Sequence, residues 1–280
     1  MKGFEMRIKT TVLLIASLAV AAGLLVGCSS PEKDAAKAAF NEQVFITQGS
    51  MDELSSLADQ AYELAASEAK ALDESLRTKL EVTAADAKTA VEGVEIPKMK
   101  SSVEDIEAQT EELKSIDLSQ EKDSLEKAMT KFENSQKKYA LVDNPSRDYI
   151  LSCVRRVKGL DEIAYFTEKT DPTKSIGKSG QYYEKIVFHS VKVDDYGYDS
   201  KLLTLEEIGN PAGGCVEAYR TAEDAERRNG QLKDMEGTIS APGSHKVVGT
   251  LVIRTSDDLT ASQQKKLESS LVKELTRLTD

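Results

Sequence analysis

The 280-residue sequence contains no tryptophan, only three cysteines and two histidines, and few aromatic residues. Three cysteines cannot form a disulfide-dense fold, and so few cysteines and histidines do not supply a zinc site, which needs three or four ligands. Six prolines and sixteen glycines exclude a collagen-like chain. Most of the chain lacks long apolar runs, so a multi-span membrane protein is also excluded.

Positive charge is the scarcer sign, because 37 Lys and Arg residues stand against 48 Asp and Glu residues, a formal net charge of −11. Proteins that bind nucleic acid gain affinity mainly from basic residues that neutralise phosphates, so no nucleic-acid partner is expected. The acidity is unevenly distributed. Residues 28–145 include 14 basic and 25 acidic residues, whereas residues 146–280 include 20 basic and 22 acidic residues. We therefore expect any protein partner at the nearly neutral second half.

The first residues have the pattern of an export signal. Lys2, Arg7 and Lys9 form a positive segment, and the uncharged, mostly apolar run 11–26 follows it. That run is short for a stable membrane span of about 20 residues. Leu25-Val26-Gly27-Cys28 then resembles the lipobox of bacterial lipoproteins. The alternative is an uncleaved membrane anchor that contains a cysteine by chance.

The lipobox resemblance implies that residues 1–27 are a signal peptide and that Cys28 carries the lipid, with acyl chains such as palmitate. Residues 28–48 are then a lipidated tether and the first helix. The protein is expected outside the cytoplasm, attached to the cell membrane through Cys28 without spanning it.

Residues 49–144 are predicted to form a helical stalk, an antiparallel coiled coil or small bundle of amphipathic helices. Apolar residues recur every three or four positions from Leu54 to Leu80, and charges fill the other positions. Capping-box spacings begin at Ser50, Thr83 and Ser101, and Gly49 and Pro97 are expected to break the helices. The narrow, Ala-rich stripes predict an elongated shape. They also leave open a groove for a partner helix or pairing between chains, so the oligomeric state is undetermined.

Residues 145–280 are predicted to form an α+β head with a mostly antiparallel sheet and helices on one face. Nine of the fourteen aromatic residues after Cys28 lie here, as expected for the larger core. The expected order is α-β-β-β-α-β-α. The helices are expected at about 145–158, 222–235 and 261–278, capped at Asn144, Thr221 and Thr260, and the strands at 163–167, 182–193, 215–219 and 247–254.

Cys153 and Cys215 are candidates for a disulfide, because an exported chain with one pair of cysteines commonly bridges them. Two buried free thiols are the main alternative. A second alternative is a catalytic pair of Cys215 with His189 or His245, although each histidine has the sequence context of a structural residue.

Other motifs carry little chemistry. Gly177-Lys178-Ser179 lacks the upstream glycine of a phosphate loop, so a polar hairpin loop is expected there. The acidic segment 194–199 matches no full calcium-loop spacing and is interpreted as a turn. No hydrolase motif is present. The sequence thus predicts no catalytic residue, metal or cofactor.

Three blocks of the head resemble a set of uncharacterised surface lipoproteins of Gram-positive bacteria, some of which carry matrix-binding-protein-like labels. The blocks are Asp171-Pro172 with Gly177-Lys178-x-Gly180-x-Tyr182; Gly213–Tyr219 with Glu223–Ala225; and Gly243–Thr250 with Ile253–Ser256 and Leu259–Gln264. The resemblance covers about residues 145–278. It implies a location in the cell envelope and a head domain, and no catalytic residue.

The leading functional hypothesis is therefore a non-enzymatic surface lipoprotein with a binding or structural role. An envelope enzyme that uses Cys215 and one histidine is the second hypothesis. A solute receptor is the third and has the least support, because such receptors need two lobes with repeated strand–helix alternation, which the first half lacks.

Overall fold

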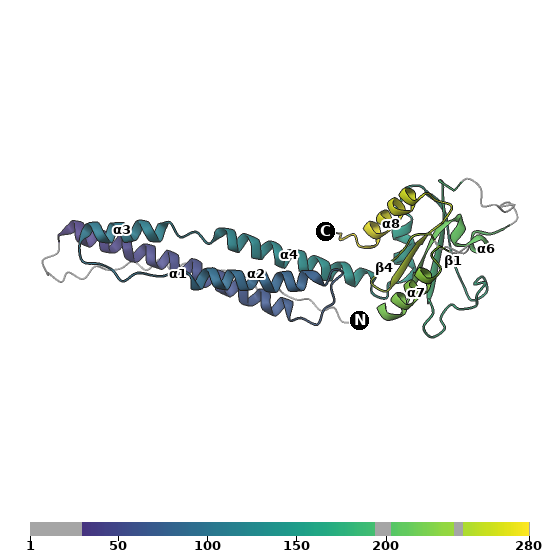
Figure 1. The fold of residues 1–280 in the computed structure, drawn as a ribbon, viewed down its shortest axis with the longest axis horizontal. Helices are drawn as coiled ribbons and strands as arrows, with labels where there is room; N and C mark the ends of the chain where they lie inside the picture. Colours follow the sequence, from purple (N-terminus) through teal and green to yellow (C-terminus); the bar gives the residue numbers. More distant parts are fainter. Residues whose placement is uncertain (1–29, 194–202, 238–242, 280) are drawn as a thin grey trace.

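The computed structural model describes residues 30–193, 203–237 and 243–279, which form a long helical stalk and an α+β head (Figure 1). The predicted fold class is confirmed, with four helices in the first part and a five-stranded antiparallel sheet in the second. The stalk is elongated, as its narrow apolar stripes predict. Its helices are α1 Pro31–Ala65, α2 Ser75–Glu92, α3 Val103–Lys114 and α4 Ser119–Val142.

The stalk has two segments with separate cores. Farther from the head, the first half of α1 packs against α3 through Phe40, Ile106 and Leu113. Nearer the head, the second half of α1 packs with α2 and α4 around Leu80 and Phe132. Since α1 has 35 residues and a helix rises 1.5 Å per residue, this one helix is about 52 Å long.

The expected break at Gly49 is wrong, because α1 continues through it. A glycine inside a helix costs only about 1 kcal/mol, which the packing of α1 against its neighbours outweighs. Ser50 and Thr83 also lie inside helices and cap nothing. Pro97 does lie between helices, and Ser102, one residue after the predicted position, caps α3 by accepting a hydrogen bond from the Asp105 N–H.

The acidity of the stalk belongs to two of its helices. α1 carries seven carboxylates and two lysines, and α3 carries five carboxylates and one lysine. In contrast, α2 has three residues of each sign, and α4 has five lysines and four carboxylates. α2 and α4 therefore present nearly balanced surfaces. The excess of negative charge lies on α3 and on the second half of α1, which carries Asp52, Glu53, Asp59 and Glu63 and no lysine.

The head contains five strands in the order β1-β2-β3-β5-β4, with every neighbouring pair antiparallel. Its elements in chain order are α5 Arg147–Val154, β1 Leu160–Tyr165, β2 Glu184–Ser190, α6 Leu205–Ile208, the 3₁₀ helix η1 Asn210–Ala212, β3 Gly213–Ala218, α7 Ala222–Asp234, β4 His245–Val248, β5 Leu251–Thr255 and α8 Ala261–Leu275. Thr221 and Thr260 cap α7 and α8 as predicted, whereas Ser146 caps α5 in place of Asn144.

Helices cover both faces of the sheet, so the prediction of helices on one face is wrong (Figure 1). Ile186, Val216 and Ile253 point to the face that α5 and α8 cover, whereas Val187 and Val252 point to the face that α7 covers. The reason is visible in β3, where all six residues are buried. A strand that is buried on both sides needs a cover on each side.

The single strand predicted for residues 247–254 is in fact the hairpin of β4 and β5. Gly249 turns the chain with a φ of +62°, a conformation that favours glycine. The turn holds the end of the stalk, because the Thr250 N–H and hydroxyl both donate to the Val142 carbonyl oxygen, at 2.9 and 3.0 Å. The Asn144 N–H donates to the same hydroxyl oxygen at 2.9 Å. Val142 belongs to the head core, so the stalk and the head pack together at this turn.

We expect Gly249→Ala to lower the free energy of unfolding of the head by about 2 kcal/mol or more. A Cβ there would lie 2.6 Å from the Val142 carbonyl oxygen, and the positive φ adds strain. The matched control is Gly230→Ala in α7, where a Cβ meets nothing within 4 Å. Because alanine has a higher helix propensity than glycine, this change should raise the free energy of unfolding by about 0.5–1 kcal/mol. Denaturant unfolding measures both; equal effects of the two variants would contradict the close contact at the turn.

Candidate functional site

Cys28 lies outside the described residues, which begin at Ser30. Ser30 caps α1 through a hydrogen bond from the Lys33 N–H. α1 begins at the end of the stalk that is farthest from the head (Figure 1). The acidic segment 194–199 also lies outside the described residues, so its interpretation as a turn stays a prediction.

The expected disulfide is not formed, because Cys153 and Cys215 are both free and buried. Cys153 is on α5, in the core on one face of the sheet. Cys215 is on β3 and points to the opposite face, against α7. The sheet separates the two sulfur atoms, so the alternative of two buried thiols is the one observed.

Cys215 has neighbours that do not activate a thiol. Its Sγ lies 3.6 Å from Asn210 Oδ1 and 3.9 Å from Glu217 Oε1. Burial raises the pKa of the Cys215 thiol, and the Glu217 carboxylate raises it further against nearby cations. The thiol is therefore protonated at neutral pH, and a protonated thiol is a weak nucleophile.

The two histidines are engaged elsewhere. His189 Nδ1 lies 2.5 Å from Asp161 Oδ1, and His245 lies 2.7 Å from Asn229 Oδ1 and 3.0 Å from Glu236 Oε1. In the part of the chain that the structure describes, neither histidine is a hydrogen-bond partner of Cys215. The structure thus does not bring together the pair that the enzyme hypothesis requires.

Thiol titration with Ellman's reagent should find no fast-reacting thiol in folded residues 29–280 and two in denaturant without reductant. Both thiols are buried, and reaction needs an exposed thiolate. A fast-reacting thiol in the folded chain would contradict the buried environment of Cys215, and its disappearance in Cys215→Ala would identify it.

The head contains a polar cluster around Glu217 that the sequence patterns did not predict. Glu217 of β3 is fully buried, and three cations surround its carboxylate: Lys185 of β2 at 3.6 Å, Arg228 of α7 at 3.0 Å and Arg254 of β5 at 3.0 Å. The Tyr219 hydroxyl also donates to the carboxylate, at 3.0 Å. A glutamate inside the otherwise apolar run 215–219 was the available signal, but its partners lie on three other elements.

The cluster keeps Glu217 ionised. Burial by itself raises the pKa of the carboxyl, but Lys185, Arg254 and Arg228 together outweigh it and lower the pKa to about 2. Asp171 behaves similarly in the loop before β2. There, burial raises the pKa of the carboxyl, but hydrogen bonds donated by the Ile176 N–H and by the Thr173 and Tyr182 hydroxyls outweigh this effect and lower the pKa to about 2.

The head should lose stability as the pH falls from about 5 towards 2. A glutamate whose pKa is lower in the folded protein than in the unfolded chain stabilises the fold at pH values above the unfolded pKa of about 4.3. This contribution to the free energy of unfolding is lost as the pH falls and the folded carboxyl becomes protonated. Glu217→Gln should cost about 3–5 kcal/mol at pH 7, since it leaves buried cations unpaired, and should flatten this pH dependence. The pH dependence of stability that remains in this variant is expected to come from Asp171, whose pKa is also lowered.

The matched control for Glu217→Gln is Glu226→Gln, which removes the same charge from an exposed position on α7. It should change the free energy of unfolding by less than about 0.5 kcal/mol. Urea unfolding at several pH values measures both variants. An effect of Glu217→Gln as small as that of the control would show that the cluster does not stabilise the head.

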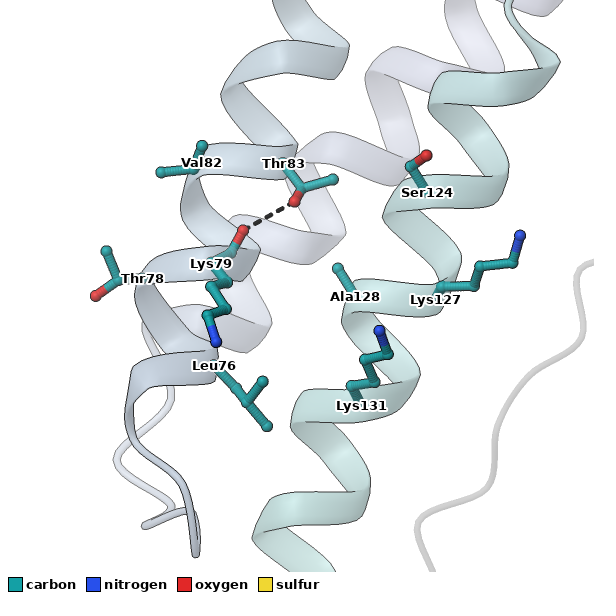
Figure 2. A pocket seen from close by; sticks show the side chains of 9 residues that line it. All are labelled: Leu76, Thr78, Lys79, Val82, Thr83, Ser124, Lys127, Ala128 and Lys131. Carbon is teal, nitrogen blue, oxygen red and sulfur yellow. Dashed lines mark hydrogen bonds between the residues drawn. The ribbon is translucent and has the colours of Figure 1, made fainter.

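One hollow lies on the stalk between α2 and α4, and we call it the stalk groove (Figure 2). It has a volume of about 600 Å³. Lys79 stands on the α2 wall, and Lys127 and Lys131 stand on the α4 wall. Leu76, Val82 and Ala128 supply its apolar surface. Lys127 pairs with Asp123 of the same helix at 3.7 Å, so part of its charge is already compensated.

A smaller hollow, the head pocket, has a volume of about 210 Å³ and lies against α8. Lys158, Lys192 and Lys266 stand around it, and Val191 and Leu267 contribute apolar surface. These residues come from the segment before β1, the segment after β2 and the first half of α8. None of the residues that line the pocket carries a carboxylate. The head pocket thus combines a basic rim with an apolar floor.

Comparisons with protein-family models, curated proteins and solved structures find no match to this chain. The resemblance to surface lipoproteins therefore stays a prediction. In residues 30–193, 203–237 and 243–279, no helix is long and apolar enough to cross a membrane, and no cluster of three or more metal-ligating side chains is present. The function has to be inferred from the geometry.

Proposed function

We propose that this chain is an extracytoplasmic lipoprotein, anchored to the cell membrane through a lipid on Cys28, whose stalk holds a ligand-binding head away from the bilayer. The observation that carries the proposal is the position of the α1 start. Pro31, three residues after Cys28, begins α1 at the end of the stalk opposite the head (Figure 1). A lipid at Cys28 would therefore anchor the far end of the stalk.

The length of the stalk supports a spacer role. α1 alone is about 52 Å long, which exceeds the roughly 30 Å thickness of a bilayer hydrocarbon core. The hydrogen bonds of Thr250 and the burial of Val142 join the stalk firmly to the head. The five carboxylates of α3, against one lysine, favour solvation of the segment nearest the anchor.

A non-enzymatic binding role is favoured over the enzyme hypothesis. The Cys215 thiol is buried and protonated, and its neighbours are Asn210 and Glu217. The head pocket, in contrast, has an open basic rim and an apolar floor, which suit binding without covalent chemistry. A solute receptor has less support, since the described residues form one sheet and one lobe.

A metabolic-labelling experiment with an alkyne fatty acid tests the anchor. The full-length chain, expressed in a bacterium that processes lipoproteins, should be labelled and should sediment with membranes. Cys28→Ala should abolish the label. If the precursor is still cleaved, the chain should also leave the membrane fraction; if it is not cleaved, the chain should stay membrane-bound but unlabelled. Cys215→Ala is the control and should behave as the wild type, because its sulfur is buried in the head.

An unlabelled wild-type chain, or a label that persists in Cys28→Ala, would refute the lipid anchor. The spacer role has its own test, which is neutron reflectometry of the lipidated chain on a supported bilayer. The protein layer should extend more than about 50 Å from the membrane surface, given the length of α1. A thin layer would show that the stalk lies flat.

A further inference from the structure

The head pocket lies at the end of the sheet that is farthest from the stalk. The stalk meets the β4–β5 turn next to Ala218 and the first residue of β2, Glu184. The pocket lies beyond the last residue of β2, Ser190, which pairs with the first residue of β1. The junction between stalk and head and the head pocket therefore lie at opposite ends of β2.

Three chain segments build the pocket. The Val191 N–H donates to the Gly159 carbonyl oxygen at 3.0 Å, which holds the segments before β1 and after β2 together. Leu259, just before α8, and four residues of α8 form the opposite wall: Gln263, Lys266, Leu267 and Ser270. Leu267 also packs against the main head core, so this wall is fixed to the rest of the head.

The floor exposes apolar surface to solvent. Val191 is 47% exposed, although Ser190 before it and Val193 two residues later are buried. Covering such a side chain with a ligand methylene chain gains free energy in proportion to the apolar area removed from water. The floor therefore favours a ligand with an apolar part.

The rim of the head pocket carries three lysines and, among the described residues that line the pocket, no carboxylate. Among the described residues, Lys158, Lys192 and Lys266 form no ion pair, in contrast to Lys185, which pairs with Glu217. An exposed lysine contributes little to binding by itself, but three lysines around one hollow act on the same ligand group. An anionic group is the ligand chemistry that this rim favours.

We propose that the head pocket binds a small amphiphilic anion, a carboxylate or phosphate group on a short apolar body. The anionic group contacts Lys158, Lys192 and Lys266, and the apolar body covers Val191 and Leu267. The volume of about 210 Å³ is below the roughly 300–1,000 Å³ of pockets for drug-sized ligands, which limits the body to a few carbon atoms. The inference specifies the ligand class for the binding role proposed above and does not depend on the lipid anchor.

The test is an NMR titration of residues 29–280, which include every described element, with hexanoate and with hexyl phosphate. Both probes should bind saturably and shift the methyl signals of Val191 and Leu267. Hexanol lacks the charge and inorganic phosphate lacks the apolar body, so each should bind at least fivefold more weakly. A preference for one of the two anions identifies the head group.

Lys266→Glu should weaken the binding of hexanoate and hexyl phosphate at least fivefold, because it reverses a charge on the rim. The matched control is Lys265→Glu, the neighbouring exposed position on α8 that does not line the pocket, and it should change affinity by less than twofold. Val191→Asn, which makes the floor polar, should weaken hexyl phosphate but not inorganic phosphate.

Equal losses in the two lysine variants would overturn the proposal, since they would indicate diffuse attraction. Binding of hexanol as tight as that of hexanoate would overturn it too, and so would the absence of shifts at Val191 and Leu267. These outcomes are separate from those of the labelling experiment. The titration uses unlipidated chain, and the labelling experiment does not involve the pocket.

Discussion

The structure of the head depends on one buried carboxylate, Glu217. It lies on β3, the central strand of five, and it holds cations from both neighbouring strands and from α7. Its pairing makes a charged cluster possible within the otherwise apolar core under α7, because three cations that are largely removed from water would otherwise oppose folding. The opposite face of the same sheet is apolar and is covered by α5 and α8.

This division between the two faces organises the rest of the molecule. The apolar face receives Val142 at the end of the stalk, so the stalk and the head share one core. The face that α7 covers keeps Cys215 buried and protonated beside Glu217. The junction with the stalk and the head pocket then lie at opposite ends of β2. In a chain anchored at Cys28, the pocket would be on the part of the head that faces away from the membrane.

Local sequence patterns predicted the features that depend on local forces. Thr221 and Thr260 cap helices as expected, because a capping side chain bonds to a backbone group within the next three residues. Gly49 and the strand 247–254 were predicted wrongly for opposite reasons. Packing against other helices carries α1 through Gly49, whereas contact with the end of the stalk turns the chain at Gly249.

The fold class, the division into a stalk and a head, and the unequal charge of the two parts could be predicted without the structure, because they follow from periodicity and composition along the chain. Three other features depend on how distant elements pack: Cys153 and Cys215 lie on opposite faces of the sheet, Glu217 meets three cations, and three lysines surround one pocket. Periodicity shows which side of an element is buried, but not which distant element lies against it. Lys158 and Lys266 are more than a hundred residues apart, and only the packing of α8 beside β1 and β2 brings them to the same pocket.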